Sequence, residues 1–298
     1  MSGQKTTSLE DSVKEMGIRK PLNRVWALGF FILATLLAGC QRPQGGLTVV
    51  GSTSVEPFAG ALAEEYMVHH SKERIYVQGG GSSAGIQAVR TEAAQVGMSS
   101  RALMPDERDL IAVPIAYDAI AIIVHPSNAV ANLSIDQIKR TFSGQMTHWK
   151  EAGGRDHPIT LVTREEGSGT REAFQHLLMG KTEISLAALV QDSNGAIRQV
   201  VADDPNAIGY ISLGLVNDRV KALKIEGVEA NVENIKRRRY KIVRPFLFVF
   251  KAQPEGMARN FLDYILSPAG QKLLVQEGLV SATTLTDSQR GAQVRENA

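Results

Sequence analysis

The sequence has a single cysteine, Cys40, among 298 residues, so the chain cannot form an internal disulfide. Net positive charge is also nearly absent, because 33 basic residues are balanced by 31 acidic ones, for a formal charge of +2. A dedicated nucleic-acid-binding protein needs a strongly basic surface, so this balance argues against that class. Apolar residues make up 43%, which suits a globular protein and excludes one that crosses a membrane many times.

Two catalytic patterns are missing as well. The histidines are scattered, and the adjacent pair His69 and His70 has no partner at metal-ligand spacing, so we expect no metal site and no cofactor. The sequence places no histidine in a triad context, so its serines lack the base that would make them nucleophiles. We therefore expect a non-enzymatic protein, with a serine-dependent phosphatase or hydrolase using Ser54 or Ser168 as the disfavoured alternative.

The N-terminal segment accounts for the one cysteine. A basic stretch that ends at Arg24 precedes an apolar run of thirteen residues, 26–38, which is short for a membrane span and typical of a signal peptide. The string Leu37-Ala-Gly-Cys40 resembles a bacterial lipobox, in which the cysteine is lipidated; the alternative is a short anchor that ends in cysteine by chance. We predict a signal peptide over 1–39, lipidation at Cys40, a tether over 40–46 and an extracytoplasmic, membrane-anchored protein.

Removal of residues 1–39 leaves 28 basic and 28 acidic residues. The mature chain then carries no net charge. If it binds an anion, its affinity must arise from the local arrangement of donors and not from the field of the whole molecule.

Short β-branched runs alternate with helical patterns along the chain. Residues 47–50 predict a strand that ends at Gly51, and Phe58, Leu62 and Tyr66 then recur at helical spacing. The same alternation continues through predicted strands at 75–77, 96–98, 159–163, 207–212 and 244–250. It predicts an α/β fold with parallel strands, in which ligands bind at the carboxyl ends of the strands. We interpret 111–124 as two strand segments with a crossing between lobes near Asp118.

Three segments repeat one design, in which a strand ends, glycine or small hydroxyl residues follow, and a helix begins. They are Gly51–Ser54, Gly79–Ser83 and Gly167–Thr170. Unpaired N–H groups at a helix start, together with Ser and Thr hydroxyls, are donors suited to an oxyanion. Any one of these loops could be only a helix cap, but three of them could surround a tetrahedral anion.

Two arginines follow predicted strands near these loops. Arg164 precedes Gly167 by three residues, where its guanidinium could bind two oxygens, with Glu166 holding it in place. Arg101, after residues 96–100, is a second candidate cation. The alternative for Arg164 is a surface ion pair, and for Arg101 a solvated strand end.

Five strings in this order resemble the substrate-binding family of phosphate ABC transporters: 51–57 (GSTSVEP), 78–83 (QGGGSS), 96–101 (VGMSSR), 164–170 (REEGSGT) and 207–214 (AIGYISLG). They spread over most of residues 47–275. The resemblance implies a two-lobed, type II periplasmic-binding-protein fold that holds phosphate between its lobes. It also implies delivery to permease subunits, by a monomer in our interpretation. Carried over by position, the phosphate donors would be Thr53, Ser54, Ser82, Arg164, Ser168, Gly169 and Thr170.

The chain departs from this family at Ser100, where many members carry an aspartate that accepts a proton from phosphate and so rejects sulfate. Asp118 could supply that acceptor; the alternative is a hinge aspartate that binds backbone amides. A receptor for another oxyanion, such as sulfate or molybdate, and a phosphate sensor acting on a signalling partner both stay open.

The expected division of the chain follows from these patterns. The first lobe would hold 47–118 and a returning part, 215–283, and the second lobe 119–214. Residues 284–298 would form a polar tail.

Overall fold

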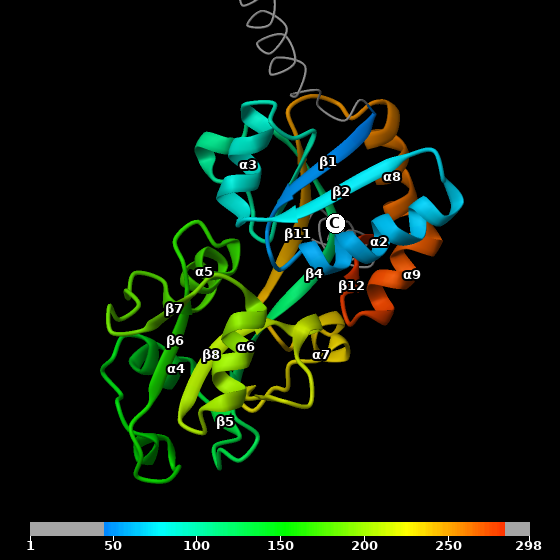
Figure 1. Cartoon of the computed structure of the whole chain (residues 1–298). Helices are drawn as coiled ribbons and strands as arrows, with labels where there is room; N and C mark the ends of the chain where they lie inside the picture. The colour runs from blue at the N-terminus through cyan, green and yellow to red at the C-terminus, as the bar shows by residue number, and fades with distance from the viewer. Residues whose placement is uncertain (1–44, 284–298) are drawn as a thin grey trace, which may run out of the picture. The chain divides into compact units, whose positions relative to one another are not determined.

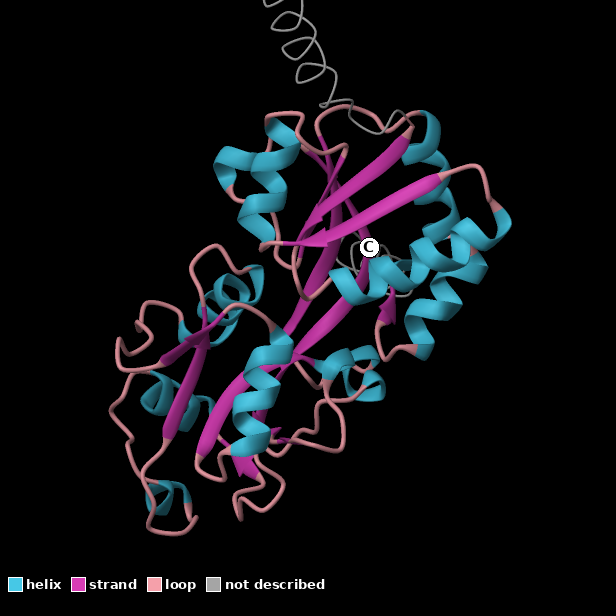
Figure 2. Cartoon of the chain, in the orientation of Figure 1, coloured by secondary structure: helices cyan, strands magenta, loops and turns pink. Residues whose placement is uncertain are grey.

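A computed structural model describes residues 45–283, which belong to one compact unit beginning at Gly45. The predicted signal peptide, the predicted lipidation site Cys40, most of the tether and the polar tail lie outside the described residues. Among the described residues, none of the helices is long and apolar enough to cross a bilayer. Figure 1 shows two α/β lobes joined by the strands β4 and β11, and Figure 2 shows the helices packed against the sheet of each lobe.

The first lobe takes its elements from both ends of the described chain. Its strands run in the order β2-β1-β3-β11-β4, and β1 lies parallel to both β2 and β3. Its elements are β1 (Gly46–Gly51), α2 (Glu56–His69), β2 (Arg74–Gly79), α3 (Ser82–Arg90), β3 (Val96–Ser99), the short 3-10 helix η3 (Pro105–Glu107), α8 (Gly256–Leu266), α9 (Pro268–Gln276) and β12 (Val280–Ser281).

The second lobe continues the same sheet in the order β4-β8-β6-β7, with β6 parallel to β7 and β8. Its other elements are β5 (Asn132–Leu133), α4 (Ile135–Phe142), η4 (Trp149–Ala152), β6 (Thr160–Arg164), α5 (Gly169–Phe174), the π-helical turn η5 (Gln175–Met179), β7 (Leu189–Gln191), α6 (Asn194–Asp203), β8 (Ala207–Ser212), η6 (Leu213–Leu215), β9 (Lys221–Ala222), β10 (Lys224–Ile225) and α7 (Val232–Lys236).

Two long strands connect the lobes. β4 (Ile111–Val124) is one continuous strand, so the prediction of two separate segments in this stretch is wrong, and the strand changes its pairing partner next to Asp118, where the crossing was expected. Up to Ala119 the strand pairs with β11 (Val243–Phe250), and from Ile120 it pairs with β8. The sequence Tyr117-Asp118 interrupts the apolar pattern without interrupting the strand, because the side chain of Asp118 finds a partner there.

Each lobe has its own hydrophobic core. The first core joins β1, β3 and the start of β4 to α2 and α8, around Phe58, Leu62 and Phe246. The second core surrounds the apolar end of β4 and β8. Apolar side chains between 220 and 242, a stretch expected in the returning part of the first lobe, pack in this second core. Burial of the two aliphatic and aromatic clusters is the main favourable contribution to folding.

Candidate functional site

The three predicted loops end at the junction of the two lobes. Thr53 and Ser54 follow β1, Ser82 begins α3 after β2, and Gly167–Thr170 covers the end of the loop after β6 and the start of α5. Contacts join them across the lobes: Ser54 Oγ lies 2.7 Å from Thr170 Oγ1, and the Ser83 N–H donates to the Gly167 carbonyl at 3.2 Å. The carboxyl ends of parallel strands from both lobes therefore meet at one place, as the sequence predicted.

Five of the seven hydroxyls in these loops are predicted phosphate donors, and each of the five accepts a hydrogen bond from a nitrogen that can only donate. The pairs are Thr53 with Arg164 Nη2 (3.0 Å), Ser54 with Asn194 Nδ2 (2.8 Å), Ser82 with the Ser100 N–H (3.1 Å), Ser168 with the Arg171 N–H (3.3 Å) and Thr170 with Arg244 Nη1 (2.7 Å). A hydroxyl carries one proton, and a nitrogen donor on its oxygen leaves that proton for another acceptor. The hydroxyls are thereby set to donate.

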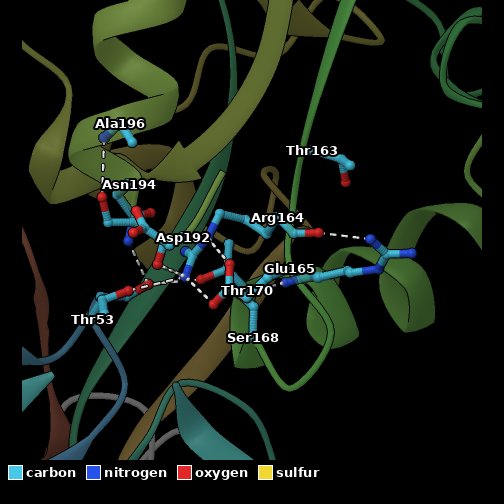
Figure 3. Close-up of polar contacts among 12 residues, drawn as sticks. Thr53, Thr163, Arg164, Glu165, Ser168, Thr170, Asp192, Asn194 and Ala196 are labelled. Carbon is cyan, nitrogen blue, oxygen red and sulfur yellow. Dashed lines mark hydrogen bonds and ion pairs between the residues drawn. The ribbon is translucent and has the colours of Figure 1, made fainter. Parts of the chain in front are cut away.

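Arg164 is the central cation of this group, and only 1% of it is exposed. Its Nε and Nη2 donate to the two carboxylate oxygens of Glu165 at 2.8 and 2.9 Å, and Nη2 also donates to the Asp192 carbonyl at 3.0 Å (Figure 3). The prediction that Glu166 holds the guanidinium is wrong, because Glu165 does so. Nη1 is buried with no hydrogen-bond partner. A buried unpaired donor is rare and costly, which marks Nη1 as a group that awaits an acceptor.

Asp118 and Arg244 form a buried ion pair on the connecting strands, where they face each other in register. Asp118 Oδ2 accepts from Arg244 Nε at 3.0 Å and Nη2 at 2.9 Å, and the third nitrogen reaches Thr170. Burial raises the pKa of Asp118 and lowers the pKa of Arg244, while their mutual attraction opposes both shifts. Asp118 therefore reaches the loops only through Arg244. Its Oδ1 makes no well-formed hydrogen bond, although the Ser212 hydroxyl lies close enough to lower its pKa.

Arg101 lies in a separate buried ion-pair cluster. Its Nη1 and Nη2 donate to Glu107 at 2.6 and 2.8 Å, and the guanidinium also pairs with Glu172 of α5. Nη2 further donates to Ser83 Oγ at 3.3 Å. The structure thus brings Arg101 to the lobe junction, but its charge is used by two carboxylates.

Ser100 and Ser82 lie side by side in the first lobe, fully buried, with their hydroxyl oxygens 3.5 Å apart. Gly169 of the second lobe packs directly against both hydroxyls, and a Cβ at Gly169 would overlap Ser82 Oγ and lie 2.7 Å from Ser100 Oγ. Glycine is needed here because the backbone of one lobe approaches the side chains of the other. Ser100 supplies a hydroxyl and no carboxylate at this position.

Two functional candidates, Asn194 and Arg244, were missed by sequence reasoning. Arg244 had a usable signal, because it is a single cation at the start of an apolar aromatic strand. Asn194 had none beyond its place at the start of a helix capped by Ser193. Among the described residues, no group of three or more histidine, cysteine, aspartate or glutamate side chains could hold a metal ion.

The fold and this ring of donors define the class as a two-lobed substrate-binding protein. A family model described as "PBP superfamily domain" matches residues 38–269, which is more than three quarters of the chain. This confirms the predicted α/β fold of two lobes.

Comparison with individual proteins identifies a narrower family within this class of substrate-binding proteins. The phosphate-binding protein PstS of Bacillus subtilis is 33% identical over 255 residues, which cover 83% of this chain and 84% of the relative. A Clostridium perfringens protein assigned as a phosphate ABC transporter substrate-binding protein, and crystallised with bound phosphate, is 41% identical with a TM-score of 0.78, covering 80% of this chain and all of that one. An ABC-type phosphate transport receptor from Vibrio cholerae has 36% identity and a TM-score of 0.67, over 78% of this chain and 99% of that one.

The chain therefore belongs to the family of phosphate-binding proteins that serve ABC transporters. This confirms the resemblance on which the sequence analysis relied. The family's role is binding and not catalysis, so the alternative of a serine-dependent hydrolase is set aside.

Proposed function

We propose that this protein binds inorganic phosphate outside the cytoplasm and presents it to the permease of an ABC transporter. The observation that carries the proposal is the shared polarity of five loop hydroxyls, each of which accepts from a nitrogen, so that their protons can face a ligand except for the one that Ser54 and Thr170 share. Phosphate oxygens are acceptors, so a site made of donors suits them. The printed names of the relatives, and the phosphate bound in the Clostridium perfringens crystal structure, support the same ligand.

The proposed ligand contacts divide into two kinds. Direct donors are Arg164 Nη1, which is buried and unpaired, the N–H groups at the start of α5, and the hydroxyls of Thr53, Ser54, Ser82, Ser168 and Thr170. Arg101 and Asp118, two further candidates from the sequence, are paired with Glu107 and Arg244 respectively. We assign them to the support of neighbouring groups. The N-terminus of α5 and the guanidinium supply the positive charge that a neutral mature chain does not provide as a whole.

The cellular setting belongs to the same proposal. A lipid on Cys40 and the tether over 40–46 would hold the protein at the outer surface of a bacterial membrane, where it would work as a monomer. Closure of the two lobes on phosphate would create the form that the permease recognises. The support is the lipobox in the sequence and the membership of a family that serves ABC transporters.

Isothermal titration calorimetry of residues 41–298 tests the ligand. We expect phosphate to bind once per chain, with arsenate as a competitor because it has the same shape and protonation chemistry. Sulfate should bind more weakly if a proton acceptor is present. If phosphate releases no heat and does not raise the melting temperature, the proposal is wrong.

A second candidate ligand, a different oxyanion such as sulfate or molybdate, is favoured by one observation, which is Ser100 in the position where many family members carry an aspartate. A site of donors alone has no group that penalises a fully deprotonated anion. Tighter binding of sulfate than of phosphate in the same titrations would establish this alternative.

A further inference from the structure

Asn194 is the first residue of α6, with 2% of its surface exposed, and it stands between the two lobes at the donor site. Its Oδ1 accepts from the backbone N–H of Ser212 at 3.1 Å. A backbone N–H cannot accept, so this bond settles which way the amide points. The amide nitrogen must then face Ser54 of the first lobe, where it donates to Oγ at 2.8 Å.

Arg244 donates to Thr170, the hydroxyl that pairs with Ser54, as Asn194 donates to Ser54. Its Nη1 donates to Thr170 Oγ1 at 2.7 Å, and its remaining nitrogens are held by Asp118. The hydroxyls of Ser54 and Thr170 lie 2.7 Å apart and share one hydrogen bond. Both oxygens thus accept from nitrogen donors that cannot change direction.

Counting the protons of the Ser54–Thr170 pair shows that it has one proton left for a ligand. Two hydroxyls have two protons, and their mutual bond uses one of them. Within residues 45–283 the second proton has no acceptor, whichever hydroxyl carries it. In either arrangement the pair offers one proton outward, and three of its four lone pairs already accept hydrogen bonds.

We propose that Asn194 is a positioning residue that fixes the Ser54–Thr170 pair as a proton donor to the bound anion. This inference rests on the proposed function, because it names how one corner of that site is prepared. The bond from Asn194 to Ser54 is then also part of lobe closure, because this bond joins α6 of the second lobe to the loop after β1 of the first. A bond of this kind forms only when the lobes are together.

An isosteric substitution separates positioning from packing. Asn194→Asp keeps the acceptor for the Ser212 N–H but replaces the donor that faces Ser54 with an oxygen. The Ser54 proton would then turn to the new carboxylate and away from the anion. Asn194→Ala removes the donor without reversing it. We expect phosphate to bind about tenfold more weakly to the alanine variant and about a hundredfold or more weakly to the aspartate variant.

The control is Asn217→Asp, because Asn217 is exposed and its Oδ1 also accepts a backbone N–H, that of Arg219 at 3.2 Å. It introduces the same charge on the second lobe without touching the donor pair, and its phosphate affinity should equal that of the wild type. Asn194→Asp should keep the melting temperature of the ligand-free wild type to within a few degrees. If its phosphate affinity equals that of Asn217→Asp, the inference is overturned.

A double-mutant cycle removes the effect of charge altogether and does not depend on the aspartate variant. If Asn194 acts through Ser54, then Asn194→Ala should weaken phosphate binding by less than about threefold in a Ser54→Ala background. A second full loss of about tenfold in that background would show independent effects and overturn the inference. Failure of the wild type to bind phosphate is a separate result, which would refute the proposed function before any variant is compared.

Discussion

At the scale of single residues, Arg164 has the sharpest consequence for binding. Its Nη1 is buried without a partner, while Glu165 and Thr53 hold the other nitrogens. We expect Arg164→Ala to weaken phosphate binding by about 2–5 kcal/mol, because a charge-assisted contact in a buried site is lost and the anion is left unpaired. Calorimetry measures the loss. Arg219→Ala, which removes an exposed arginine of the same lobe, is the control, and equal affinities for the two variants would move the site away from β6.

Glu107 provides a test of stability against pH. Burial alone would raise its pKa, but hydrogen bonds from Arg101 and from the Met104 N–H hold the pKa below the usual 4.5. A carboxyl with a depressed folded pKa contributes stability above its unfolded value and loses it as pH falls through the folded value. Glu107→Gln should therefore cost about 3 kcal/mol near neutral pH, since Arg101 keeps only Glu172. The difference from the wild type should shrink below about pH 4.5.

Urea unfolding at several pH values checks this prediction, with Glu233→Gln as the control. Glu233 is exposed and pairs with Arg237 one turn along α7, so its loss should change stability little at any pH. A Glu107→Gln difference that stays constant from pH 7 to pH 3 would contradict the assignment of the buried pair.

At the scale of elements, α5 and α3 approach each other across the lobe junction through Gly169. Alanine is a better helix former than glycine, so Gly169→Ala should not weaken α5 itself. The added Cβ would instead overlap Ser82 Oγ and hold the lobes apart. We expect phosphate to bind about tenfold more weakly or worse, because overpacking of a tight contact costs about 1–3 kcal/mol.

Gly60→Ala in α2 is the matched control, because a Cβ there would meet no atom within 4 Å. Small-angle scattering with and without phosphate adds a second readout. The Gly169 variant should remain more open than the wild type in saturating phosphate. An unchanged affinity would mean that α5 and α3 do not need to touch for binding.

The strands β4 and β11 carry the Asp118–Arg244 pair at the point where the chain passes between lobes. Asp118→Asn would leave a buried guanidinium without its carboxylate, which should cost about 3–5 kcal/mol of stability. Because Asp118 reaches the loops through Arg244 and Thr170, phosphate and sulfate binding should fall by similar factors. A loss confined to phosphate would instead identify Asp118 as the group that accepts a proton from the ligand. Asp263→Asn, which breaks an exposed pair with Arg259 on α8, is the control.

At the scale of the whole molecule, the position of the protein in the cell depends on Cys40. Two or more acyl chains give stable anchoring where one would not. We expect Cys40→Ser to accumulate as unprocessed precursor or to be released as a soluble form. Cell fractionation shows whether the variant is membrane-bound, and intact-mass measurement shows whether it is processed. A processed, membrane-bound Cys40→Ser protein would contradict the lipobox interpretation.

The local part of this protein was determined by its sequence. The three strand–loop–helix segments were predicted, and the structure has each of them, with Arg164 as the last residue of β6 where the sequence placed it just after the strand. These features depend on consecutive residues, since hydrophobic periodicity, glycine and capping hydroxyls act over a few positions of chain. The roles of the predicted donors toward phosphate stay predictions.

Only the tertiary structure decided which groups prepare those loops. Asn194 is 140 positions from Ser54, and Arg244 is 126 positions from Asp118, so no local pattern could pair them. The register of β4 with β11 places Arg244 opposite Asp118, and the contact between the lobes places Asn194 against Ser54. Glu165 rather than Glu166 holds Arg164 for the same reason, because side-chain direction at the end of β6 is set by what surrounds it. Directional hydrogen bonds between distant residues require the assembled fold, whereas a loop's capacity to donate does not.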